Sequence, residues 1–288
     1  VGVTTIDFSG KYWRLRWNSD LMLAGGISIS LSKHNRHSRW RYLAYVSVGP
    51  LTTLITGLVS IGIWSLLPQS PASMPLLFFS LMSAGIFIAT SFPLPMGLLR
   101  TDGYRVIKLI WRYDDEARAW IASTDIMAAL ASGESLQTLD KNLFDDLRAN
   151  PHDKFSIVYY EYLLALEIGD TEHILQSAAI LEEMLEDLPS IIRKDIEVEL
   201  AFVYGWIASD PVKFQRYYEA IENTLESPSA PNYRVIASNY RITGQLQAMH
   251  ETLLTAQQFL QTDRSMGNGN EQMIINRLLQ ESVHPNPM

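Results

Sequence analysis

The chain lacks cysteine among its 288 residues, which excludes disulfide bonds and thiolate metal sites. Charge is missing from two long stretches, residues 42–67 and 76–99. Acidic side chains are scarce before residue 114, where eleven Lys and Arg face three Asp, a net charge of +8. The whole chain has 23 basic and 31 acidic residues, so 12 basic and 28 acidic residues lie after position 113, a net charge of −16. This asymmetry predicts two domains, at 1–112 and 113–282.

The two uncharged stretches are long enough to be transmembrane helices, because a hydrocarbon core of about 30 Å needs roughly 20 apolar helical residues. Basic residues precede the first stretch and follow the second, which predicts that both outer ends lie in the cytoplasm. We therefore expect an integral protein of the cell membrane, in contact with the lipid bilayer, with a cytoplasmic C-terminal domain. Small residues in both stretches favour close helix packing: Gly49, Gly57, Gly62, Ser83, Ala84, Gly85 and Ala89.

Two short strands are predicted before the first membrane stretch, at residues 2–6 and 11–17. They would form a small hairpin or sheet at the membrane edge. The hairpin could have a purely structural role, covering the membrane edge of the protein. Alternatively, its open strand edge could pair with an extended peptide. The chain begins with Val1, and no signal-peptide pattern precedes Tyr42, so we expect it to be truncated at its N-terminus.

Asp102 is the first candidate for function, because an ionised carboxylate at a membrane boundary is costly and usually marks a metal, proton or substrate site. It follows an apolar run that is broken by Pro93 and Pro95. Proline lacks an N–H donor, so the helix should end there and Asp102 should emerge into a protein-lined pocket. A plain helix N-cap is the alternative role for Asp102.

Three segments in this order resemble the site-2 protease family of membrane zinc metallopeptidases. They are Leu23-Ala-Gly-Gly26, Val48-Gly-Pro-Leu51, and Phe92-Pro-Leu-Pro95 followed by Thr101-Asp-Gly103. The resemblance implies that Asp102 is a zinc ligand, and that two histidines and a glutamate of an upstream HExxH helix complete the site. A catalytic zinc takes three protein ligands and activates a water molecule for attack on a peptide carbonyl. The substrate would be a membrane protein or peptide.

The chain departs from the family pattern in that it contains no HExxH sequence, so the zinc site is incomplete and this chain alone should be inactive. No catalytic residue is therefore assigned. Thr53 and Ser91 stand where the family commonly has asparagine, which puts substrate binding in doubt. His34 and His37 are a weaker metal pair, because the basic residues around them would repel a cation and suit lipid headgroups. A non-catalytic membrane scaffold is the alternative function.

The acidic part reads as amphipathic helices, and three stretches share a helix-turn-helix pattern with turns at Gly169-Asp170, Ser209-Asp210 and Gly244-Gln245. The spacing predicts a soluble, tetratricopeptide-like helical repeat that could bind a protein partner. We expect its aromatic residues to form the core and Glu182, Glu183, Glu197 and Glu199 to be solvated. This part has no stripe of basic residues that could follow a phosphate backbone, so we expect no nucleic acid partner. The fold class is therefore mainly α, with a disordered tail at 283–288. The predicted core residues are Tyr159, Tyr160, Tyr162, Leu163, Phe202, Tyr204, Trp206, Tyr217 and Tyr218.

Overall fold

The structure is a computed structural model that divides into two compact units, Val1–Ser32 and Lys33–Met288. In the first unit, β1 (Val3–Asp7) pairs antiparallel with β2 (Arg14–Asn18). The described residues add no third strand to this pair, and its predicted place at a membrane edge stays a prediction. The described residues are 3–7, 14–18, 39–68, 70–93, 95–96, 99–150, 153–262 and 268–283.

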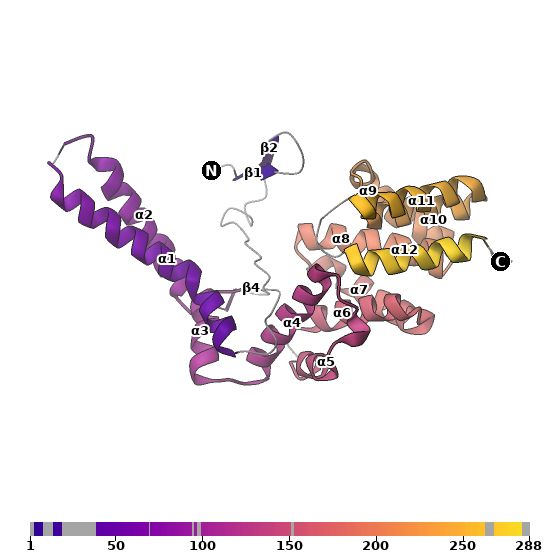
Figure 1. Ribbon diagram of the computed structural model, residues 1–288, viewed down its shortest axis with the longest axis horizontal. Coiled ribbons are helices and arrows are strands. Elements are labelled where there is room, and N and C mark those ends of the chain that lie inside the picture. The colour runs from indigo at the N-terminus through magenta and orange to yellow at the C-terminus, as the bar shows by residue number, and fades with distance from the viewer. Residues whose placement is uncertain are drawn as a thin grey trace. The chain divides into compact units, whose positions relative to one another are not determined.

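The second unit begins with two helices, α1 (Arg39–Leu66) and α2 (Met74–Ser91), that pack along each other as a hairpin (Figure 1). Both are long and apolar enough to cross a membrane. At Gly57 the backbones approach closely, since a Cβ there would lie 3.1 Å from the Cβ of Ser83. The predicted role of small residues in this contact therefore applies to Gly57 and Ser83.

The helix α2 ends at Ser91, so it covers only the first part of the predicted stretch 76–99. Phe92 has an extended backbone, with φ −71° and ψ 127°, as expected for a residue before a proline. A short antiparallel pair follows, formed by β3 (Pro95–Met96) and β4 (Leu99–Arg100). This turn leads directly into α3 (Asp102–Trp111).

The remaining residues are mainly helical and form successive helix pairs. The predicted turns at Gly169, Ser209 and Gly244 are all present, and each contains a residue with positive φ, at 79°, 51° and 74° respectively. Left-handed backbone is the usual way to end a helix and reverse the chain. The pairs are α4 (Asp115–Ser132) with α5 (Lys141–Arg148), α6 (Lys154–Ile168) with α7 (Thr171–Met184), α8 (Ser190–Phe202) with α9 (Pro211–Leu225), and α10 (Ala230–Ile242) with α11 (Leu246–Thr262).

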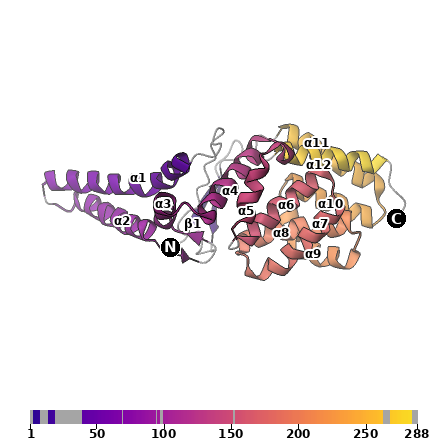
Figure 2. The same ribbon diagram turned by 90° about the horizontal axis from the view of Figure 1, so that it is seen from below.

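A last helix, α12 (Asn268–Val283), packs along α11 and also contacts α4, α6 and α10 (Figures 1 and 2). Its apolar residues Ile274, Ile275 and Leu278 are fully buried in one continuous core. The predicted aromatic core is confirmed, because all its members are buried in this core or pack against it. Of the predicted disordered tail, Val283 ends α12 and residues 284–288 lie outside the described part of the chain.

Candidate functional site

The N-terminal end of α3 is held by Thr101. Its hydroxyl oxygen accepts a hydrogen bond from the Tyr104 backbone N–H and donates one to the carbonyl oxygen of Phe92, at 3.4 and 2.7 Å. Thr101 is therefore the N-cap, and it also ties α3 to the end of α2. The alternative role of Asp102 as the cap is wrong, because Asp102 is the first residue of the helix itself.

Gly103 brings α3 into direct contact with the end of α2. A Cβ on this residue would lie 1.8 Å from the carbonyl oxygen of Ser91 and 2.9 Å from its Cα. Real Cβ atoms do not approach backbone this closely, so only glycine fits. The close neighbour of Gly103 is therefore the backbone of Ser91.

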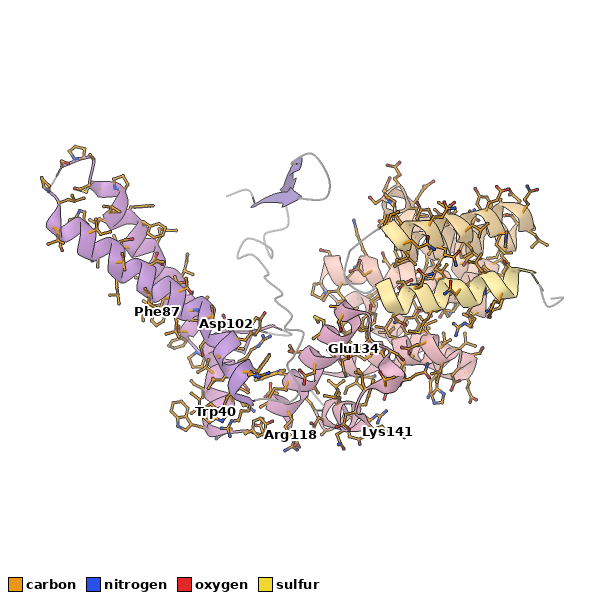
Figure 3. The ribbon with its side chains drawn as sticks, viewed as in Figure 1. Trp40, Phe87, Asp102, Arg118, Glu134 and Lys141 are labelled. Atoms are coloured by element: carbon orange, nitrogen blue, oxygen red, sulfur yellow. The ribbon has the colours of Figure 1, made fainter. Side chains whose placement is uncertain are left out.

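The Asp102 carboxylate lies at the junction of α1, α2 and α3 (Figure 3). Its Oδ2 atom is close to the backbone of α1, since a Cβ on Gly49 would lie 3.8 Å from it. Burial raises the pKa of Asp102 above its ordinary value, and the nearby positive charge of Arg105 only partly opposes this. Within the described residues, no hydrogen bond or ion pair is found for this carboxylate. Asp102 is thus a half-buried acid beside the Gly49-Pro50 segment.

The described residues supply a single candidate metal ligand at this junction. No group of three His, Asp or Glu side chains is found there or elsewhere in the described part of the chain. His34 and His37 lie outside the described residues. Thr53 donates its hydroxyl proton to the Gly49 carbonyl oxygen, at 3.0 Å, so this side chain is engaged by its own helix. A zinc ion at Asp102 would need further ligands from outside the described residues.

Arg39 joins the start of α1 to the end of α3. Its guanidinium donates to the carbonyl oxygens of Leu109 and Ile110, at 2.5 and 2.8 Å. A positive charge at the last carbonyls of a helix also matches the helix dipole. The start of α1 and the end of α3 therefore lie on the same side of the hairpin, as the positions of the basic flanks predicted.

Lys108 connects α3 to α4 through two ion pairs, 2.6 Å to Asp114 and 2.8 Å to Glu116. Burial alone would lower the pKa of Lys108, but the hydrogen bonds to these two carboxylates raise it well above its ordinary value. The lysine therefore stays charged. Tyr42, Val46, Leu109, Ala117 and Ile121 form a small apolar core beneath this link. The helical part is thus joined to the hairpin by both charge and packing.

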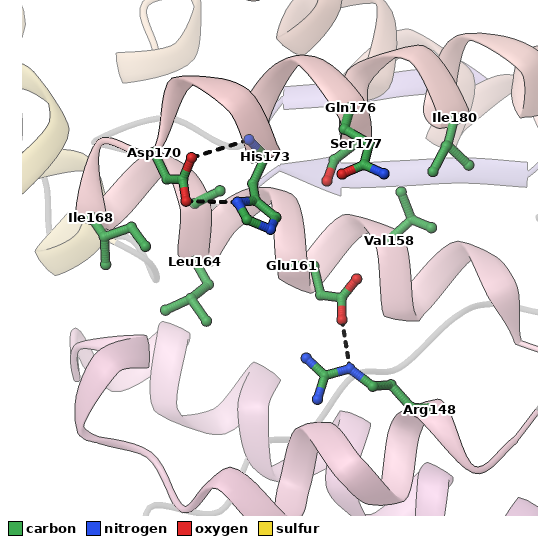
Figure 4. A pocket seen from close by; sticks show the side chains of 11 residues that line it. Arg148, Val158, Glu161, Leu164, Ile168, Asp170, His173, Gln176, Ser177 and Ile180 are labelled. Atoms are coloured by element: carbon green, nitrogen blue, oxygen red, sulfur yellow. Dashed lines mark hydrogen bonds and ion pairs between the residues drawn. The ribbon is translucent and has the colours of Figure 1, made fainter.

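A hollow of about 440 Å³ opens among α5, α6 and α7 (Figure 4). One part of its wall is apolar, with Val158, Leu164 and Ile168, and its rim is polar. On the rim, Arg148 pairs with Glu161 at 2.7 Å, and Asp170 contacts His173 at 2.6 Å. A mixed apolar and polar lining and a volume in this range are typical of binding pockets. Sequence reasoning did not locate this hollow.

Buried charges are the other feature that sequence reasoning missed. Arg234 is completely buried, and its guanidinium contacts Glu199 at 2.9 Å and Glu271 at 3.0 Å. The Tyr162 hydroxyl donates to Glu199 at 2.7 Å. The prediction that Glu199 is solvated is wrong, and so is that for Glu182, which accepts hydrogen bonds from Lys213 and Tyr217. Glu183 is exposed as predicted.

The spacing of these polar contacts was a usable signal. Tyr162, Glu199, Arg234 and Glu271 are 37, 35 and 37 residues apart, and they lie on α6, α8, α10 and α12. Tyr217 and Glu182 are likewise 35 residues apart. The predicted turns at Gly169, Ser209 and Gly244 are 40 and 35 residues apart, which is close to this spacing. Each contact therefore joins positions one structural repeat apart.

Comparison with protein-family models, with curated proteins and with solved structures finds no match for this chain.

Proposed function

We propose that this chain is part of an intramembrane zinc metalloprotease of the site-2 protease type, in which Asp102 is a zinc ligand. The observation that carries the proposal is the position of the Asp102 carboxylate. It is half-buried at the start of α3, its Oδ2 lies beside Gly49 of α1, and no hydrogen bond or ion pair to it is found among the described residues. A costly acid that pairs with none of the described residues suits a ligand for a cation.

The proposal also relates three segments that are separate in the sequence. Thr101 and Gly103 fix the start of α3 against Phe92 and Ser91, and this places Asp102 next to the Gly49-Pro50 segment of α1. The Gly-Pro, Pro-rich and Asp-Gly segments that suggested the family therefore meet at one junction. The spatial convergence supports a shared site.

The residues of this chain supply one ligand of such a site. Asp102 would contribute a carboxylate oxygen to the metal, while two histidines and a glutamate base must come from elsewhere in the protein. Zinc, when bound, activates water at near-neutral pH for attack on a peptide carbonyl. The helix α3 and its contacts to Ser91 and Phe92 would hold the carboxylate in place.

The proposal is tested in the protein that the complete reading frame encodes. An HExxH sequence there is required, and its absence from the complete reading frame would reject the protease function. In such a protein, Asp102→Asn should lower the zinc content and abolish cleavage of a membrane substrate. Asp115→Asn is the matched control, because Asp115 is an exposed carboxylate in the first turn of the next helix. Unchanged zinc content in Asp102→Asn would rule out the ligand role.

The second candidate function is a membrane-anchored scaffold, whose tetratricopeptide-like helical array binds a protein partner. The hollow among α5, α6 and α7 favours it, together with polar contacts that recur at 35 to 37 residues, a spacing typical of such repeats. The array would then present this hollow to a partner on the cytoplasmic side.

A photo-crosslinking residue at Gln176, on the rim of the hollow, tests the scaffold function in intact membranes. A scaffold should give one defined adduct, and Ile168→Glu should remove it by placing a charge in the apolar wall. Val212→Glu is the control, because Val212 is an exposed apolar residue that does not line the hollow. Adducts that are insensitive to Ile168→Glu would argue against binding in the hollow.

A further inference from the structure

An exposed apolar patch surrounds the junction of α1 and α3. We define the junction patch as five side chains on this surface, in which the two tryptophans are 67% and 73% exposed. Exposed clusters of large apolar residues usually mark an interaction surface. The members of the junction patch are Trp40, Ile107, Ile110, Trp111 and Tyr113.

Arg39 holds this patch together. Its guanidinium binds the carbonyl oxygens of Leu109 and Ile110, and it lies 5.5 Å from the ring centre of Trp40 and 4.8 Å from that of Tyr113. The guanidinium of Arg39 thus contacts both Trp40 of α1 and Tyr113, which follows α3. The exposed apolar side chains of the patch therefore belong to one organised surface.

The helix α3 has two apolar faces. Leu109, with Val106 beside it, packs into the small core with Tyr42 and Ile121. Ile107, Ile110 and Trp111, spaced by three and four residues, form the opposite, exposed face. A short helix whose outer face carries two isoleucines and a tryptophan is unsuited to bulk water.

The junction patch continues the exposed apolar stripe of α1. Trp40 is followed on the same face by large exposed apolar residues at helical spacing, and no charged residue occurs in α1 after Arg41. From Trp40 to Leu66 the helix is ~39 Å long at 1.5 Å per residue, which places Trp40 at the end of a span rather than within it. Tryptophan favours this interfacial depth. The residues of the stripe are Val48, Leu51, Ile55 and Leu58.

Exposed arginines border the patch. Arg41 follows Trp40, and Arg112 follows Trp111. The nearby carboxylates of Asp114 and Glu116 are already neutralised in part by Lys108. Cationic side chains beside an aromatic surface match the negative headgroups of a membrane interface.

We propose that the junction patch is an interfacial anchor: α3 lies in the membrane interface, with Trp40 and Trp111 among the lipids and Arg41 and Arg112 at anionic lipid headgroups. The proposal rests on the membrane insertion of α1 and α2, which is part of the proposed function, and does not require protease activity. The anchor would hold the first residues of α3, including Asp102, at a fixed depth.

The absence of cysteine allows site-specific nitroxide labelling of the full chain. Trp111→Cys and Ile107→Cys report on the patch. Leu81→Cys, on the exposed surface of α2, reports on membrane insertion, and Val212→Cys, which is 79% exposed on α9, is the aqueous control. The labelled proteins are reconstituted in phosphatidylcholine vesicles with and without phosphatidylglycerol, and the label is probed with oxygen and with a water-soluble nickel chelate.

We expect labels at 107 and 111 to be accessible to oxygen and shielded from nickel, more so with phosphatidylglycerol. The double variant Arg41→Gln with Arg112→Gln, or high salt, should remove this dependence on phosphatidylglycerol. Each arginine should contribute roughly fivefold to the binding of the patch to the anionic membrane. If the labels at 107 and 111 are shielded from nickel equally with and without phosphatidylglycerol, the assignment of the arginines to anionic headgroups is overturned. Nickel access at 111 with a lipid-buried label at 81 would overturn the anchor alone, and shielding from both reagents would show a protein contact instead.

A label at residue 81 that is exposed to nickel would overturn the membrane insertion and the anchor together. It would leave the zinc content of the Asp102 variants, measured separately, as the test of the metal site.

Discussion

Gly103 lies directly on the backbone of Ser91, twelve residues earlier, so closely that a methyl group on its Cα would lie 1.8 Å from the Ser91 carbonyl oxygen. This contact joins the end of α2 to the start of α3. Next to it, Thr101 binds the Phe92 carbonyl oxygen. The position of Asp102 is therefore set by its two neighbours rather than by its own side chain.

Gly103→Ala should separate α3 from α2 and displace Asp102, because neither the Ser91 backbone nor the α3 backbone can move aside without breaking the turn. We expect a lower melting temperature in detergent and faster hydrogen exchange in α3. Gly62→Ala and Gly85→Ala are matched controls, since a Cβ at either position meets nothing within 4 Å. They should be neutral or slightly stabilising, because alanine is the better helix former by about 1 kcal/mol. Equal behaviour of all three variants would contradict the close contact at Ser91.

Arg234→Met should strongly destabilise the helical array, because it leaves Glu199 and Glu271 buried without their cation. Removing one partner of a buried ion pair costs about 3–5 kcal/mol. Chemical denaturation followed by circular dichroism measures this cost. Arg216→Met is the control, because Arg216 is exposed and its ion pair with Glu182 is long, at 3.9 Å. A loss of stability no larger than that of the control would show that the cluster is dispensable.

Glu271→Gln should be much milder than Arg234→Met. Burial raises the pKa of Glu271, the Glu199 charge adds to this, and Arg234 opposes it. Its Oε2 is buried without a hydrogen-bond partner in the described structure, so a neutral amide keeps the shape and removes a poorly satisfied charge. The same denaturation measurement should give a change below about 1.5 kcal/mol. A loss as large as that of Arg234→Met would mean that Glu271 is required as an anion.

The sequence predicted the helix pairs well, because Gly169, Ser209 and Gly244 interrupt clear amphipathic patterns. It predicted the end of α2 through Pro93, whereas the assignment of Asp102 as a metal ligand stays a prediction. It failed for Glu182 and Glu199, because amphipathic patterning treats every carboxylate as solvated. Their burial depends on partners a whole repeat away, such as Tyr217 and Arg234. The hollow at α5 to α7 depends on three-dimensional packing and leaves no local pattern.

Glu182 should make the helical array sensitive to acid. Burial alone would raise the pKa of Glu182, but hydrogen bonds from Lys213, Tyr204 and Tyr217 outweigh it and lower the pKa below its ordinary value. A lowered pKa in the folded state means that the stabilisation is present above the unfolded pKa of about 4.3 and is lost as pH falls through the folded pKa.

Glu182→Gln should therefore lower stability near neutral pH, by about 1–3 kcal/mol for lost hydrogen bonds to a charged group, and flatten the loss of stability below pH ~4. Thermal denaturation across pH measures both effects. Glu183→Gln is the matched control, because Glu183 is the exposed neighbour. An unchanged pH profile in Glu182→Gln would remove this residue as the source of the acid sensitivity.

Ser209→Gly should stabilise the turn between α8 and α9. Ser209 has φ 51°, and it is the single residue other than glycine with positive φ in the described part of the chain. An L-residue with a side chain pays roughly 1–2 kcal/mol in this region, and glycine avoids it at the expense of a more flexible unfolded chain. We expect a net gain of up to about 1 kcal/mol, seen as slower hydrogen exchange in both helices. Ser227→Gly, at an exposed position with ordinary φ, should lower stability slightly, because there glycine adds only unfolded-state freedom. A stabilising effect at both positions would show that the gain comes from the loss of the serine side chain and not from the left-handed backbone at Ser209.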